Sequence, residues 1–248
     1  RERGITILSK NTAIKWRDFC INIVDTPGHA DFGGEVERIL SMVDSVLLLV
    51  DSVDGPMPQT RFVTQKAFAR GLRPIVVINK IDRDGARPDW VLDQTFELFD
   101  NLGATDAQLD FPVIYSSATL GYARLEPDGG QDNMNALFEM IVDSVAPPNV
   151  THDGSFQMQV SSLDYSSYVG AIAIGRVQRG TVRPGQAITL VTSEGVRRNA
   201  KILEVLGFNG LTREQRKEAE AGDIIAVTGI DGVRISDTLC DPAHVEPL

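Results

Sequence analysis

The spacing of apolar residues divides the chain into two parts of different character. In the first part, short apolar runs typical of buried strands alternate with segments whose apolar residues recur at helical spacing. Strands that alternate with helices of ten or more residues indicate an α/β fold, with a mainly parallel sheet and helices on both faces. The expected strands lie at 5–16, 19–24, 45–50, 74–78 and 113–115, and the expected helices begin near 31, 59, 88 and 134.

From residue 155 onward, the apolar runs become short and rich in β-branched residues, with Gly, Pro and Asp between them. This pattern is typical of an all-β barrel. The segment Ala146-Pro147-Pro148-Asn149 lies between the two patterns and is expected to belong to a linker. The sequence therefore predicts an α/β domain over 1–146, a linker over 147–154 and a barrel domain over 155–248.

The composition argues against several classes of protein. The chain has 248 residues and a net charge of -10, which argues against general adhesion to DNA or to a membrane surface. Cys20 and Cys240 are the only cysteines and are far apart, which favours a reduced, cytoplasmic setting. No apolar run approaches the length of a membrane span. The chain opens at Arg1 and soon adopts a strand pattern, so we expect a further segment to precede it.

The first candidate site follows the second expected strand, which ends in Asp25-Thr26-Pro27-Gly28-His29. An acid at a strand end can hold a hydrated metal ion through water, and the amide of Gly28 is free to meet an anion. His29 would then lie beside that anion. The alternative is a tight turn in which Asp25 caps the next helix and His29 faces solvent.

The second candidate site is Asn79-Lys80-Ile81-Asp82, directly after an apolar strand. A carboxylate at Asp82 can accept two hydrogen bonds from guanine, whereas adenine would leave it unpaired. The Asn79 amide can bridge to another loop, and the aliphatic stem of Lys80 can lie against a flat base. The alternative is an ordinary polar turn.

Two weaker signals accompany these. The small residues Ser116-Ser117-Ala118 follow the strand at 113–115 and would let a base oxygen approach closely. The hydroxyl of Thr6, in Arg3-Gly4-Ile5-Thr6-Ile7, could ligate Mg²⁺. In isolation, the structural alternatives are favoured: an ordinary strand end for Ser116-Ser117-Ala118 and a β-branched strand residue for Thr6.

Taken together and in this order, the four motifs resemble the GTP-binding domain of translational GTPases, a P-loop GTPase fold. The forms RGITI and DTPGH carry the resemblance. Longer stretches, such as GPMPQTRFVTQKAFARGLRPIVVINKIDR and FQMQVSSLDYSSYVGAIAIGRV, are similar to members related to elongation factor G. The resemblance implies a cytoplasmic, ribosome-associated enzyme that hydrolyses GTP to GDP with Mg²⁺, in translation or in ribosome assembly under stress.

The resemblance also implies a role for each motif. Thr6 would bind Mg²⁺ beside an apolar gate at Ile5, and Asp25 would bind the metal through water. Gly28 would donate its amide to the γ-phosphate, and His29 would orient the attacking water. The base would be read by Asn79, Lys80 and Asp82 together with Ser116, Ser117 and Ala118.

One motif of the family is missing from this sequence. The phosphate loop of the family, GxxxxGK followed by Ser or Thr, does not occur in the 248 residues. We expect it to precede Arg1, and expect the chain alone to lack its first central strand and to be inactive. The alternatives are a hydrolysis-incompetent module that binds RNA or the ribosome, or a related factor such as elongation factor G, LepA or a ribosome-protection protein.

The second part carries a local basic segment in an otherwise acidic chain. Between residues 176 and 201, six basic residues stand against one acid, which leaves a local charge of +5. Such a segment either reaches RNA phosphates or protects a sheet edge from aggregation. The resemblance favours RNA of the small ribosomal subunit. Tyr165 and Tyr168 could pack against that surface, although aromatic residues in barrels more often lie in the core.

Overall fold

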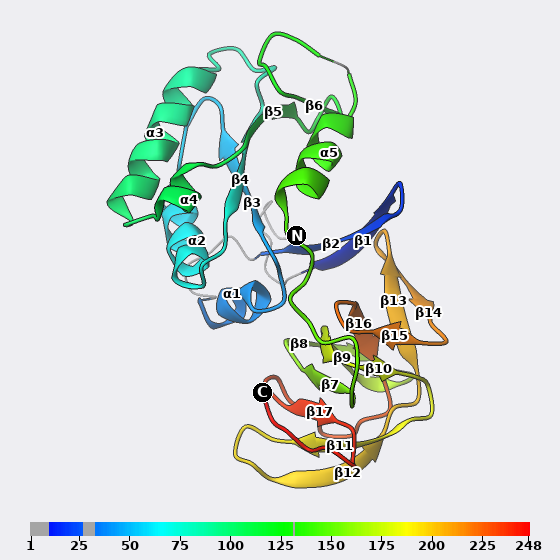
Figure 1. Ribbon diagram of the computed structural model, residues 1–248. Coiled ribbons are helices and arrows are strands. Elements are labelled where there is room, and N and C mark those ends of the chain that lie inside the picture. Colours follow the sequence, from blue (N-terminus) through cyan, green and yellow to red (C-terminus); the bar gives the residue numbers. More distant parts are fainter. Residues whose placement is uncertain (1–9, 27–32, 131) are drawn as a thin grey trace. The chain divides into compact units, whose positions relative to one another are not determined.

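The computed structural model describes residues 10–26, 33–130 and 132–248 (Figure 1). Two compact units divide the chain. One comprises residues 28–147, and the other joins residues 1–27 to residues 148–248. Each unit has its own core.

A four-stranded sheet forms the centre of the first unit (Figure 1). Its order is β3 (Val46–Asp51), β4 (Pro74–Asn79), β5 (Val113–Ser117) and β6 (Tyr122–Arg124). The first three strands are parallel, as the alternating pattern predicted. The short strand β6 was not predicted and pairs antiparallel with β5.

Helices cover both faces of this sheet, because alternate strand residues point to opposite sides and both sets are apolar. Figure 1 shows α2, α3 and α4 on one side and α5 on the other. Phe99 of α3 is fully buried on the first face, and Leu137 of α5 lies on the second. The helices are α1 (Gly33–Leu40), α2 (Pro58–Ala69), α3 (Pro88–Asn101), α4 (Asp106–Leu109) and α5 (Asn135–Ser144).

Strand β3 lies at one edge of the sheet, since among the described residues only β4 pairs with it. The side chain of Leu49, in the middle of β3, is 60% exposed. This edge therefore combines open backbone groups with an uncovered apolar side chain.

The second unit is a largely antiparallel, β-barrel-like domain. Its main sheet has the order β12-β11-β17-β7-β9-β16-β13-β14, with β8 paired to β9. An apolar cluster that includes Phe156, Ile188 and Leu239 fills its interior. The strands are β7 (Gln157–Gln159), β8 (Ser162–Ser166), β9 (Gly170–Arg179), β10 (Thr181–Val182), β11 (Ala187–Val191), β12 (Arg197–Lys201), β13 (Val205–Asn209), β14 (Thr212–Gln215), β15 (Ala219–Glu220), β16 (Ile224–Val227) and β17 (Thr238–Cys240).

The hairpin of β1 (Lys10–Trp16) and β2 (Phe19–Asp25) belongs to this second unit. Both strands were predicted, but the sequence placed them in a domain over 1–146. In the structure the Gly210 amide donates to the Ala13 carbonyl at 2.8 Å, and the Ala13 side chain is buried there. This contact groups the hairpin with the barrel. Across the described ranges, no helix is long and apolar enough to cross a membrane.

Candidate functional site

The carboxyl ends of three parallel strands bring the candidate residues to one edge of the sheet. Asp51 at the end of β3 is in register with Asn79 at the end of β4, and Asn79 is in register with Ser116 of β5. Ligands of open parallel sheets bind at this edge. The predicted residues 79–82 and 116–118 therefore lie together.

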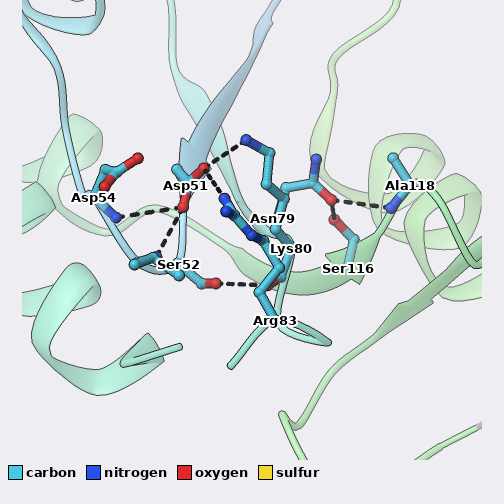
Figure 2. A network of polar contacts seen from close by, with 9 residues as sticks. Asp51, Ser52, Asp54, Asn79, Lys80, Arg83, Ser116 and Ala118 are labelled. Atoms are coloured by element: carbon cyan, nitrogen blue, oxygen red, sulfur yellow. Dashed lines mark hydrogen bonds and ion pairs between the residues drawn. The ribbon is translucent and has the colours of Figure 1, made fainter. Parts of the chain in front are cut away.

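Asn79 forms the bridge between the two loops. Its side-chain oxygen accepts hydrogen bonds from the Ser116 hydroxyl at 3.1 Å and from the Ala118 amide at 3.0 Å. In Figure 2 the amide nitrogen of Asn79 points away from both donors. With its oxygen occupied, Asn79 keeps two N–H donors for a ligand.

Lys80 is held by a carboxylate from the neighbouring strand. Its ammonium donates to Asp51 Oδ2 at 2.6 Å, and the Arg83 guanidinium lies 3.7 Å from the same oxygen (Figure 2). The amides of Val53 and Asp54 donate to Asp51 Oδ1 at 2.8 and 3.3 Å. Burial raises the pKa of Asp51, but the hydrogen bonds from Lys80 and the two amides lower this pKa by more, so the carboxylate stays ionised at neutral pH.

Ser52 holds the backbone at Asn79 and Lys80 through two hydrogen bonds. Its amide donates to the Asn79 carbonyl at 2.9 Å, and its buried hydroxyl donates to the Lys80 carbonyl at 2.8 Å. Lys80 has a φ of 66°, in the left-handed region that costs a non-glycine residue about 1–2 kcal/mol. The bonds from Ser52 hold Lys80 in this unfavourable conformation.

Replacing Ser52 with alanine tests this clamp. Ser52→Ala removes a buried hydrogen bond and is expected to lower the free energy of unfolding by about 1–2 kcal/mol. Ser45→Ala is the matched control, because the Ser45 hydroxyl also donates to a backbone carbonyl, that of Arg73 at 2.7 Å, but in an exposed setting. The control should change stability by less than about 0.5 kcal/mol in chemical denaturation. Equal losses in both variants would contradict the clamp.

Asp82 lies in the loop that these bonds tie down. The Ile81 amide donates to the Ser116 carbonyl at 3.2 Å, and the Arg83 amide donates to the Lys80 carbonyl at 3.1 Å. The Asp82 side chain is exposed and makes no hydrogen bond or ion pair with any other residue that the structure describes. Its oxygens are therefore available to accept hydrogen bonds from a ligand.

The loop at 116–118 offers a ligand its backbone rather than its hydroxyl groups. The Ser117 hydroxyl is buried and accepts a bond from the Leu120 amide at 3.2 Å, and the Ser116 hydroxyl is used on Asn79. Ala118 is exposed beside them. Small residues here give a ligand room to approach the Ala118 backbone.

The other predicted site residues precede the sheet in the chain, between residues 5 and 29. Asp25 ends β2, is exposed, and belongs to the hairpin and barrel unit. Ile5, Thr6, Gly28 and His29 lie outside the described residues. Of the two predicted Mg²⁺ ligands, only Asp25 is described, and the described ranges hold no group of three or more His, Cys, Asp or Glu suited to a metal. One carboxylate still fits Mg²⁺, which commonly binds one or two carboxylates together with substrate phosphates.

Asp51 and Ser52 were missed in the sequence. The signal was present, because Asp51 ends the apolar run Val46–Val50 just as Asp25 ends the run before it. Polar residues at the ends of buried parallel strands mark the ligand-binding edge at Asp51, Asn79 and Ser116.

The basic segment of the barrel does not form one free surface. Arg176 is buried, Arg179 pairs with Glu246 at 2.7 Å, and Arg183 pairs with Glu218. The exposed basic residues that remain lie on β12, an outer strand of the sheet: Arg197, Arg198 and Lys201. This strip is short and fits edge protection as well as RNA contact.

The two tyrosines lie at the surface. Tyr165 is 76% exposed and Tyr168 is 95% exposed, beside the turn that joins β8 to β9. The expectation that barrel aromatics lie in the core is wrong for this pair, because both residues lie at a hairpin end that no described residue buries. A separate cavity of about 40 Å³, lined by Cys20, Asn22 and Phe208, is too small for a nucleotide.

Comparison with known proteins gives two family matches. Residues 1–147 match the family described as "Elongation factor Tu GTP binding domain", and residues 170–240 match "Elongation factor Tu domain 2". The chain is 64% identical over 248 residues to "Large ribosomal subunit assembly factor BipA" of Escherichia coli (strain K12) and of Haemophilus influenzae. All of this chain is aligned, but it spans only 41% and 40% of those relatives.

A solved structure shares the fold. Translation elongation factor SelB from Methanococcus maripaludis, in complex with the GTP analogue GppNHp, is similar with a TM-score of 0.76. The match covers 96% of this chain and 50% of that chain at 23% identity. The predicted combination of an α/β domain and a β-barrel domain is therefore confirmed.

Proposed function

The chain belongs to the family of the elongation factor Tu GTP-binding domain. We propose that the full-length protein is a ribosome-associated GTPase of the BipA type. It binds GTP and GDP and hydrolyses GTP to GDP and phosphate. The relatives are named as large ribosomal subunit assembly factors, which supports a role in ribosome assembly.

The arrangement around Asn79 carries the proposal. Two parallel strands bring an oriented amide, a free carboxylate at Asp82 and the exposed Ala118 backbone to one sheet edge. Guanine offers an N1–H and an exocyclic amine to a carboxylate, and its O6 can accept from the Ala118 loop. Adenine has the opposite pattern at these positions, so the same residues would reject it.

The remaining residues act on the phosphates. In this proposal Gly28 donates its amide to the γ-phosphate, His29 orients the attacking water, and Ile5 closes an apolar gate beside it. Thr6 and Asp25 hold Mg²⁺, the latter through water. Mg²⁺ held by these two residues would supply positive charge beside the phosphates.

The barrel contributes contacts with the ribosome. We place the small-subunit RNA against the β12 strip and the exposed Tyr165 and Tyr168, since cations reach phosphates and aromatic rings stack on unpaired bases. The same features would serve a hydrolysis-incompetent binding module, which is the second candidate function. A cytoplasmic location follows from either role.

Nucleotide binding and turnover by the full-length protein test the proposal. Fluorescent GDP is expected to bind at least about a hundredfold more tightly than fluorescent ADP, because ADP leaves Asp82 unpaired. GTP turnover should rise when ribosomes are added. Equal affinity for the two nucleotides would overturn the guanine site, and guanine binding without turnover would favour the binding module. The 248 residues alone, which lack a phosphate-loop motif, should not hydrolyse GTP.

A further inference from the structure

Asp51 receives the side chains on both sides of Asp82. Lys80 precedes Asp82 by two residues and Arg83 follows it directly, and both cations turn to Asp51 Oδ2, at 2.6 and 3.7 Å (Figure 2). Asp82 lies between them and contacts neither. The two carboxylates thus lie at the ends of neighbouring strands, and among the described residues only Asp51 is paired.

The preference of Lys80 and Arg83 for Asp51 over Asp82 has a physical cause. The Asp51 side chain is only 14% exposed and accepts two backbone amides besides the cations. A carboxylate fixed in this way is a stronger partner for a cation than an exposed one, whose charge is screened by water. Without the charge on Asp51, Lys80 and Arg83 would have Asp82 as a neighbouring anion.

The ion pair also fixes a flexible side chain. The Lys80 side chain is 48% exposed, and a free lysine loses up to about 2 kcal/mol of rotamer freedom when it is ordered. Because Asp51 already holds the ammonium, much of that cost is met before a ligand arrives. The aliphatic stem is thereby held at the strand end, next to Asn79.

We propose that Asp51 is a positioning residue of the base site: it holds the ammonium of Lys80 and the guanidinium of Arg83, and so keeps the Asp82 carboxylate free for guanine. The inference rests on the proposed function, since it concerns affinity at the same site. In this role Asp51 acts through the two cations and not by contact with the nucleotide.

Calorimetric titration of the full-length protein with GDP tests this role. Asp51→Asn keeps the shape of the side chain but removes its charge, and should raise Kd about tenfold. Asp54→Asn is the matched control, because Asp54 is exposed on the same turn and contacts Asp51 only through its backbone amide. It should change Kd less than about twofold. Asp51→Glu, which keeps the charge, should stay within about threefold of the natural protein.

A second background separates positioning from a structural role. In protein that carries Lys80→Met and Arg83→Met, Asp51→Asn should change Kd by less than about twofold, because the cations through which it acts are gone. An equal loss of affinity in both backgrounds would overturn the proposal, since Asp51 would then act only by shaping the turn at 51–55. A loss no larger than that of Asp54→Asn would overturn it as well.

A measurement without nucleotide tests the hold of Asp51 on Lys80 separately from the proposed guanine site. The rate of Lys80 acylation by an N-hydroxysuccinimide ester, followed by mass spectrometry, should rise about threefold or more in Asp51→Asn as the ammonium is released. An unchanged rate overturns the inference even if GDP binds. Failure of the natural protein to bind GDP, with a faster rate in Asp51→Asn, would overturn the proposed function while the hold on Lys80 stands.

Discussion

Replacing Asp82 with asparagine is expected to raise the Kd of the full-length protein for GDP at least about a hundredfold. Each hydrogen bond to a charged group contributes about 1.5–3 kcal/mol, and an asparagine cannot accept both guanine donors at once. Its amide would instead present one donor and one acceptor. Titration with GDP in calorimetry or fluorescence measures the change.

The same change should create a new preference. Xanthine carries an N1–H and a carbonyl where guanine carries an N1–H and an amine, so the asparagine variant should bind xanthosine diphosphate more tightly than GDP. Asp84→Asn is the matched control, because Asp84 is an exposed acid two residues further along the loop. A weakened variant without the xanthine preference would place the effect of Asp82 in the loop conformation, and an unchanged Kd would remove Asp82 from the site.

Replacing His29 with alanine is expected to lower ribosome-stimulated GTP turnover about 10²- to 10³-fold. A positioned histidine that orients or polarises the attacking water contributes an effect of this size. His29 acts on the phosphate end of the nucleotide in this proposal, so the affinity for GDP should stay within about threefold. Single-turnover phosphate release at saturating ribosomes measures the rate.

His152→Ala provides the comparison, because His152 is an exposed histidine in the segment before β7. Turnover in this control should remain that of the natural protein. If both variants keep full turnover, His29 has no part in hydrolysis. If His29→Ala loses GDP affinity in parallel with turnover, the residue supports the nucleotide pocket as a whole.

The local sequence predicted the sheet and its ligand-binding edge because both depend on short-range patterns. Apolar runs between helical segments predict parallel strands, and polar residues that end such runs must meet at one edge. The loop at 79–82 and the loop at 116–118 therefore came together as expected, with Asn79 as the bridge.

Features that depend on tertiary partners escaped the sequence. The pairing of Arg179 with Glu246 spans 67 residues, and no local pattern in the basic segment announces it. The hairpin of β1 and β2 was predicted as two strands, but its grouping with the barrel depends on distant contacts such as that between Ala13 and Gly210. Asp51 resembles an ordinary strand end in the sequence, because Lys80, which pairs with it, lies 29 residues further along the chain.

Among the residues that the structure describes, nothing pairs with the outer side of β3, so this side can accept a further strand. A row of unpaired peptide groups with Leu49 uncovered beside it can accept any extended segment that offers matching peptide groups and an apolar side chain. A strand from the same molecule would complete the sheet and shield that leucine. A strand from another copy would instead join two molecules through their backbones.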